Sequence, residues 1–180
     1  MLWQQLIHKL EAAEPQAIAF SESRPVIYID TQQQLLCCAT AQDKVIQFYP
    51  VSTSKFGLGQ RQGSFKTPTG IHKIAKKIGQ NEPVGRVFKS RVATQEIVLS
   101  EDFCGDEDVI TSRILWLEGL QDGYNCAGDV DTLGRYIYIH GTADEAHIGQ
   151  PASIGCIRMK NFDIIKLFDK VEVNDLVIIE

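Results

Sequence analysis

The chain has 180 residues, a formal net charge of −5 and a hydrophobic fraction of 44%. This length favours one domain with a sizeable buried core, and the composition is typical of a soluble globular protein. The acidic balance, without a lysine–arginine cluster, argues against nucleic acid or an anionic membrane surface as a partner. No stretch of the sequence is long and apolar enough to predict a transmembrane segment.

The first 24 residues predict an amphipathic helical extension, followed by one domain over residues 25–180. Leu2, Leu6 and Leu10 share a helical face with Trp3 and Ile7. The segment lacks the basic region and continuous apolar core of a signal peptide. Five cysteines without a Cys-x-x-Cys pair suit a reducing compartment better than a disulfide framework. These features predict a cytoplasmic location; the alternative is a periplasmic or cell-wall protein whose signal is missing from this sequence.

The rest of the sequence predicts a mainly β fold of the α+β class. Apolar runs of strand length recur between polar turns, at residues 26–30, 35–39, 44–51, 71–78, 96–99, 110–117, 136–140 and 176–179. Near the C-terminus, Asn161 is a favourable N-cap residue for a helix. The apolar residues after it repeat at helical spacing, at Ile164, Leu167, Phe168 and Val171. We therefore expect a β core with an N-terminal helix and a second helix near the C-terminus.

One histidine and one cysteine lie in surroundings that suit thiol chemistry. His140 ends the apolar run 136–140, and Cys156 follows Gly155 in a loop before the predicted helix. A cysteine attacks a carbonyl carbon as the thiolate, and a neighbouring imidazole can take its proton. The pattern therefore predicts Cys156 as the nucleophile and His140 as the general base of an acyl transfer. No catalytic role is predicted for the other four cysteines, Cys37, Cys38, Cys104 and Cys126.

The segments around this pair resemble the signature of the L,D-transpeptidase family, whose catalytic domain is of the YkuD type. The resemblance rests on residues 140–142 (His-Gly-Thr), 153–159 (Ser-Ile-Gly-Cys-Ile-Arg-Met) and the upstream turn 67–70 (Thr-Pro-Thr-Gly). It runs from about residue 26 to residue 179, nearly the whole chain apart from its first two dozen residues. It implies a β-sandwich or sheet core of the L,D-transpeptidase type, with the helix directly after the cysteine loop.

The resemblance also implies roles beside the histidine, and it has one departure. In the family a backbone carbonyl just after the histidine fixes its tautomer; this maps to Gly141, with Thr142 as a neighbour. Family members usually carry a histidine between the serine and the glycine of the cysteine motif, where this chain has Ile154. The lost side chain bears on rate and specificity rather than on the class of reaction.

The residues around the cysteine are candidates for binding the substrate. The backbone N–H groups of Ile154, Gly155 and Cys156 could converge on the negative charge that develops on the carbonyl oxygen. Ser153 either contacts substrate or holds the loop. Arg158 either binds a substrate carboxylate and favours the thiolate, or forms a structural ion pair. Residues 79–131 are expected to form a flap or wall over the site.

The expected reaction follows from the resemblance alone. Family members attack the carbonyl of the third residue of a peptidoglycan tetrapeptide stem, and the terminal D-alanine leaves. The resulting thioester is resolved by an amine of another stem, which makes a 3-3 crosslink, or by water, which makes a tripeptide. Carbapenem β-lactams acylate the thiol of family members. The partners implied are peptidoglycan stems or soluble muropeptides, with no cofactor.

The combination of free thiols and no export signal favours an L,D-carboxypeptidase that trims soluble muropeptides. The first alternative is an L,D-transpeptidase that forms crosslinks or exchanges D-amino acids. The second is a wall-peptide binding module with weak or no turnover, suggested by Ile154. A metal site at His140, His147, Cys126 and Cys156 is not expected, because zinc ligands usually occur in pairs at short spacing.

Overall fold

A computed structural model describes residues 24–39, 46–105 and 109–180, so the predicted N-terminal helix lies outside the described residues. The described residues form one ten-stranded sheet, three short 3-10 helices and one α-helix, α3 (Asn161–Phe168). The strands are β1 (Val26–Asp30), β2 (Leu35–Ala39), β3 (Ile46–Ser52), β4 (Gly70–Ile78), β5 (Arg86–Lys89), β6 (Val92–Ile97), β7 (Ile110–Gly119), β8 (Tyr138–Thr142), β9 (Ile157–Met159) and β10 (Leu176–Ile179). None of the described helices has the length and apolarity that a membrane span requires.

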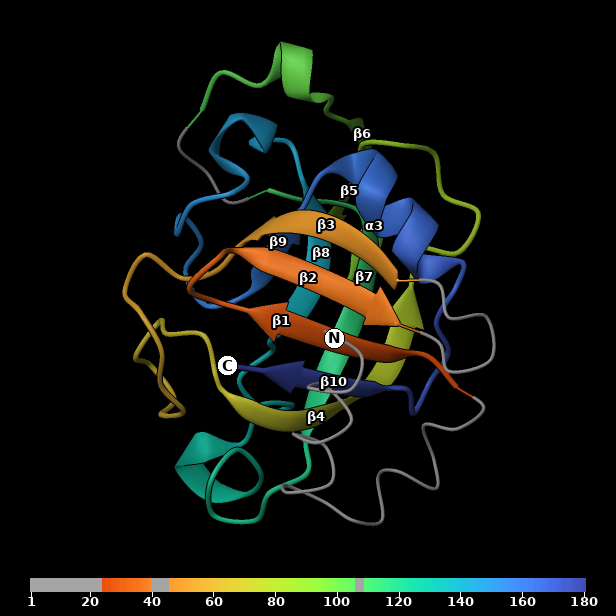
Figure 1. Ribbon diagram of the computed structural model, residues 1–180. Coiled ribbons are helices and arrows are strands. Elements are labelled where there is room, and N and C mark those ends of the chain that lie inside the picture. The colour runs from red at the N-terminus through yellow and green to blue at the C-terminus, as the bar shows by residue number, and fades with distance from the viewer. Residues whose placement is uncertain (1–23, 40–45, 106–108) are drawn as a thin grey trace.

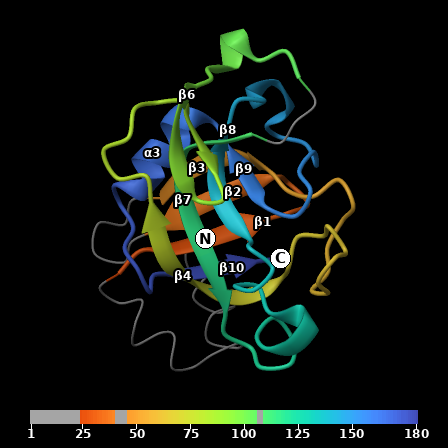
Figure 2. The same ribbon diagram turned by 180° about the vertical axis from the view of Figure 1, so that it is seen from behind.

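Eight of the strands close into a flattened ring. The order in the sheet is β4-β10-β1-β2-β3-β9-β8-β7, and β4 also pairs with β7, which closes the circle. The β5–β6 hairpin extends from β7 outside the ring. In Figure 1 the layer of β1, β2, β3 and β10 faces the viewer, and Figure 2 shows β7 and β8 side by side on the opposite layer. The mainly β fold predicted from the sequence is confirmed.

The interior of the ring is filled by aliphatic side chains from both layers and from α3. Side chains alternate between the two faces of a strand, so every second residue points inward. Leu115, Ile139 and Ile157 on β7, β8 and β9 are fully buried in this cluster. Ile164 and Phe168 of α3 join the same cluster, which fixes the helix against the sheet immediately after β9.

The N-cap position predicted for Asn161 is wrong. Lys160 occupies the N-cap position, and Asn161 is the first residue of α3, with its side chain buried. Its amide nitrogen donates to Thr142 O at 2.9 Å, and its amide oxygen accepts from the Thr111 hydroxyl at 2.7 Å. Its backbone N–H donates to the Glu145 carboxylate at 2.8 Å. Asn161 therefore joins α3 to β7, to β8 and to the loop after β8.

The strands predicted from the longest apolar runs occur with small shifts of their ends. The run at 136–140 forms β8 two residues later, over Tyr138–Thr142, and the run at 96–99 overlaps only the end of β6. Two strands were missed: β5 is short, and β9 spans three residues of the cysteine motif, for which the sequence predicts a loop. Such short strands carry too few residues to show a period of two.

The buried imidazole of His72 on β4 generates a prediction about pH and stability. Burial lowers the pKa of His72 from 6.5 to about 4. In the unfolded chain the ring takes up a proton below about pH 6.5, whereas in the folded chain it stays neutral down to about pH 4. Stability should therefore fall as the pH drops through this window, by at most roughly 3 kcal/mol from this residue.

We expect His72→Gln to flatten the pH dependence of the free energy of unfolding between about pH 6.5 and 4. Urea unfolding of the variant and of the wild type at several pH values measures this difference. His147→Gln is the matched control, because this imidazole is exposed. If the free energy of unfolding of His72→Gln falls with pH as steeply as that of the wild type, carboxylates alone cause the loss of stability in acid.

Candidate active site

The register of β8 and β9 places His140 and Cys156 on the same face of the sheet. Ile139 pairs with Ile157 in this parallel ladder, and both side chains point into the core. Because side chains alternate along a strand, the residues on either side of this pair point outward. Cys156, just before Ile157, and His140, just after Ile139, are thus diagonal neighbours on the outer face. Side chains at such positions lie within reach of each other.

The His140 imidazole is held by its own strand. Its Nδ1 lies 2.8 Å from the carbonyl oxygen of Gly141, and the side chain is only 1% exposed. A carbonyl can only accept, so Nδ1 carries the proton and Nε2 is the basic nitrogen. This is the tautomer that a general base for the thiol requires.

The Cys156 thiol is half-buried and contacts the backbone of the segment that leads into β8. Its Sγ accepts from the Tyr138 N–H at 3.4 Å and lies 3.6 Å from the Tyr136 carbonyl oxygen. The N–H favours the thiolate, because a donor stabilises negative charge on sulfur. By contrast, burial raises the pKa of Cys37 and of Cys38 to about 11. Those two thiols are inert at neutral pH.

Two hydroxyl groups, those of Ser153 and Thr67, hold the loop before Cys156 by hydrogen bonds to its backbone. Ser153 Oγ donates to the Cys156 carbonyl at 2.6 Å and accepts from the Gly155 N–H at 3.2 Å. Thr67 Oγ1, in the Thr-Pro-Thr-Gly turn, donates to the Gly155 carbonyl at 2.9 Å. Gly155 adopts a φ of +134°, a conformation that other residues rarely take. Of the two roles predicted for Ser153, this geometry supports holding the loop over contacting substrate.

Arg158 lies on the face of His140 but is directed at an acidic side chain. It pairs with His140 in the β8–β9 register, is 5% exposed, and its guanidinium lies 3.4 Å from the Asp144 carboxylate. Asp144 also contacts the exposed His147 at 2.6 Å. The structure thus contains the ion pair that was one of the two roles predicted for Arg158.

Thr142 has no exposed surface, and its hydroxyl accepts from the Asp144 N–H at 3.1 Å. It therefore shapes the loop after β8, and its buried hydroxyl is engaged within that loop. Ile154, at the position where a histidine is usual, is 48% exposed. It lines a small cavity of about 150 Å³ together with Phe65, Arg135 and Tyr136. The departure from the motif thus gives this hollow, one residue before Gly155, an apolar wall.

Arg135 is a candidate functional residue that the sequence did not reveal. Burial lowers the pKa of its guanidinium, and the negative charge of a Cys156 thiolate opposes this fall. The attraction between the two charges is mutual, so the positive charge of Arg135 also favours the thiolate form of Cys156. Arg135 also donates to Gly59 O at 3.1 Å and to Lys66 O at 2.6 Å, so it fastens the 54–67 loop beside the nucleophile. A single arginine without a motif gives no signal in a sequence.

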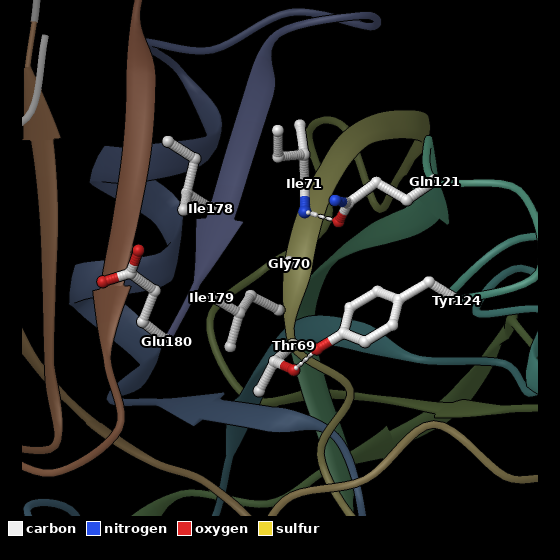
Figure 3. Close-up of a pocket in the computed structure, with 8 residues that line it drawn as sticks. All are labelled: Thr69, Gly70, Ile71, Gln121, Tyr124, Ile178, Ile179 and Glu180. Atoms are coloured by element: carbon white, nitrogen blue, oxygen red, sulfur yellow. Dashed lines mark hydrogen bonds between the residues drawn. The ribbon is translucent and has the colours of Figure 1, made fainter. Parts of the chain in front are cut away.

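A larger cavity of about 390 Å³ lies at the ends of β4 and β10. Figure 3 shows Tyr124 and Gln121 on one side of it and the isoleucines of β10 on the other. The Tyr124 hydroxyl lies 2.7 Å from Thr69 Oγ1, and the Gln121 side chain accepts from the Ile71 N–H at 2.8 Å. None of the residues that line this cavity is a cysteine or a histidine, so the cavity does not include the predicted pair Cys156 and His140.

Residues 24–179 match the L,D-transpeptidase catalytic domain of the YkuD type, and the chain belongs to this family. No curated protein matches the chain. The resemblance noted in the sequence is therefore confirmed. The chain therefore contains the catalytic domain of an L,D-transpeptidase-family enzyme.

Solved structures, two L,D-transpeptidases among them, share the fold at low sequence identity. An L,D-transpeptidase from Mycobacterium smegmatis is 16% identical with a TM-score of 0.51, over 88% of this chain and 59% of that one. L,D-transpeptidase 3 from Mycobacterium tuberculosis, in complex with a faropenem-derived adduct, is 15% identical with a TM-score of 0.53, over 87% and 60%. Bd1075 from Bdellovibrio bacteriovorus is 20% identical with a TM-score of 0.52, over 93% and 50%. This chain thus spans about half to three fifths of these relatives.

We expect Gly141→Ala to abolish most activity by displacing the carbonyl that holds His140. A Cβ at this position would lie 2.6 Å from the backbone oxygen of Thr111 and 3.1 Å from Ile164 Cγ2, so β8 must shift. The strain should cost about 1–3 kcal/mol of stability. Turnover and urea unfolding, measured on the same preparation, give both effects. Wild-type turnover in the variant would contradict the role of this carbonyl.

We expect Arg135→Gln to raise the pH at which the Cys156 thiol reacts, because the positive charge that favours the thiolate is lost. Alkylation by iodoacetamide as a function of pH, followed by mass spectrometry of the peptide containing Cys156, measures the change. Arg61→Gln, in the same loop region but exposed, is the control. Equal profiles for all three proteins would remove Arg135 from the site.

Proposed function

We propose that this enzyme cleaves the L,D-peptide bond before the terminal D-alanine of peptidoglycan tetrapeptide stems and releases the amino acid by hydrolysis. The observation that carries the proposal is the placement of Cys156 and His140 on one sheet face, with the imidazole tautomer set by Gly141 O at 2.8 Å. The family supplies the substrate class. Soluble muropeptides are the proposed form of the substrate.

The proposed reaction has two half-reactions at Cys156. His140 Nε2 takes the thiol proton, and Sγ attacks the carbonyl carbon of the third stem residue. The tetrahedral intermediate collapses when the D-alanine nitrogen takes the proton from His140 and leaves, which forms a thioester. Water then loses a proton to His140, attacks the thioester carbon and expels Sγ, which recovers the proton. The products are a tripeptide and D-alanine.

In the tetrahedral intermediate of each half-reaction, the carbonyl oxygen carries a negative charge that hydrogen-bond donors must stabilise. The N–H of Gly155 donates to Ser153 Oγ at 3.2 Å, so this amide is engaged in the present conformation. We therefore place the proposed oxyanion contacts on the neighbouring amides of Ile154 and Cys156, on either side of the bend at Gly155.

Transpeptidation, by an amine in place of water, is the second candidate. It uses the same thioester, and the access of an acceptor stem to Cys156 decides between the two outcomes. The binding module is the weakest candidate, because both groups of the predicted pair are present on one face. The five cysteines, all among the described residues, form no disulfide, which supports the proposed location in the reducing cytoplasm.

We expect the purified protein to convert a disaccharide-tetrapeptide into the disaccharide-tripeptide, even with excess acceptor stem or D-amino acid. Mass spectrometry of the products measures this directly. Cys156→Ala should lose all turnover and keep its fold, because the partly exposed thiol contributes little to the core. Crosslinked dimers or exchanged D-amino acids would make the protein a transpeptidase. Turnover by Cys156→Ala would refute the nucleophile assignment.

We expect a carbapenem to add its mass to Cys156 alone, because acylation requires a thiol that is both accessible and activated. Intact mass followed by peptide mapping locates the adduct. Cys104 is exposed and outside the proposed site, so Cys104→Ser is the matched control and should react as the wild type does. An adduct on Cys104 or Cys126 would point to non-specific thiol reactivity instead.

A further inference from the structure

The tip of the β5–β6 hairpin carries Arg91 to the outer face of β7 and β8. Ser90 and Arg91 connect the two strands with φ angles of +50° and +68°, which makes a tight turn. Phe88 and Ala93 of this hairpin pack in the same outer cluster as Tyr138 and Cys156. The hairpin, part of the segment that the sequence predicted as a wall, therefore lies against the nucleophile.

Three aromatic residues hold the guanidinium of Arg91 in place. Its Cζ lies 5.0 Å from the centre of the Trp116 ring and 4.7 Å from the centre of the Tyr136 ring. Its Nη1 donates to the Tyr138 hydroxyl at 3.2 Å. The Trp116 ring is itself fixed, because its Nε1 donates to the Leu133 carbonyl at 3.1 Å. Stacking on aromatic faces orients a guanidinium while its N–H groups point outward along its edge.

Two of the three residues that hold Arg91, Tyr136 and Tyr138, also contact the thiol. The Tyr138 N–H donates to Cys156 Sγ at 3.4 Å, and the Tyr136 carbonyl lies 3.6 Å from the same atom. In the sheet, Trp116 pairs with Tyr138, so the aromatic side chains form a row that ends at Cys156. Tyr138 therefore contacts both groups: its hydroxyl accepts from Arg91, and its backbone N–H donates to the reacting sulfur.

Among the described residues, no carboxylate lies within salt-bridge distance of Arg91. Lys76, the second cation at the Trp116 ring at 5.1 Å, likewise has no acidic partner in the described part of the chain. Arg158 differs, since it is buried and directed at Asp144. The site therefore presents a fixed, partly exposed guanidinium without an internal anion from these residues, beside a nucleophile.

We infer that Arg91, with Lys76 nearby, forms a carboxylate-binding site that recognises the free α-carboxylate of the residue leaving from the substrate. This inference rests on the proposed function. In a terminal D-alanine only one carbon separates the scissile nitrogen from the carboxylate, so a carboxylate site must lie close to the thiol. A guanidinium binds a carboxylate through two parallel hydrogen bonds. Such a site selects stems that end in a free acid, which is the specificity of a carboxypeptidase.

The experiment compares a tetrapeptide stem that has a free C-terminal carboxylate with the same stem as its carboxamide. We expect the wild type to prefer the acid by roughly tenfold to a hundredfold in kcat/KM, which is typical of charge-assisted hydrogen bonds. Arg91→Gln should lose this preference by slowing the acid only. Lys89→Gln removes a charge from the same hairpin at an exposed position and should behave as the wild type does.

Two further experiments test whether Arg91 binds another carboxylate of the substrate and whether its role is only structural. A stem with lysine as third residue lacks the side-chain carboxylate of a diaminopimelate stem. If Arg91→Gln affects only the diaminopimelate stem, the site binds that carboxylate and the inference about the leaving residue is wrong. An equal loss on acid and amide would give Arg91 a merely structural role, and thermal unfolding of Arg91→Gln and Arg91→Lys tests that directly.

Binding to Cys156→Ala separates a failure of the inference from a failure of the proposed function. Calorimetry with the acid and the amide measures recognition without turnover. If the wild type cleaves neither stem, the proposed reaction is wrong. The carboxylate site still holds if Cys156→Ala binds the acid more tightly and Cys156→Ala with Arg91→Gln does not. Equal affinities for acid and amide in Cys156→Ala would overturn it.

Discussion

The parallel pairing of β8 with β9 is the constraint on which the candidate active site depends. Three residue pairs hold this ladder, and the inward-pointing Ile139 and Ile157 anchor it in the core. With these two residues fixed, the alternation of side chains sends His140 and Cys156 to the other face. The nucleophile and the base are thus positioned by aliphatic packing behind them. A slip of one residue by either strand would turn its own catalytic group inward and separate the pair.

Polar contacts on the helix side of the sheet support the same ladder. The buried Asn161 side chain bonds to Thr111 on β7 and Thr142 on β8, and its backbone bonds to Glu145. Gly141 lies against these groups with no room for a side chain. The backbone carbonyl that orients His140 is therefore part of a rigid unit. Buried polar groups that are fully hydrogen-bonded make such units cooperative.

Three arginines near the site have three different environments. Arg158 is buried in an ion pair with Asp144, and Arg135 fastens the 54–67 loop while favouring the thiolate. Arg91 stacks on Trp116 and Tyr136 without an acidic partner among the described residues. In the sequence the three residues are equivalent, because each is an arginine. Their hydrogen-bond partners and burial distinguish a structural role, an electrostatic role and a role in binding.

The sequence by itself determined the class of fold, most strands of the ring, the helix after the cysteine loop and the pair Cys156 and His140. Long apolar runs and a specific motif are local features, so they are visible in the order of residues. The tertiary structure alone decided the closure of the ring through β4 and β7, the strand β9, and the parts played by Asn161, Arg135 and Arg91. Those features depend on contacts between residues far apart in the chain, and a single sequence does not show which distant residues meet.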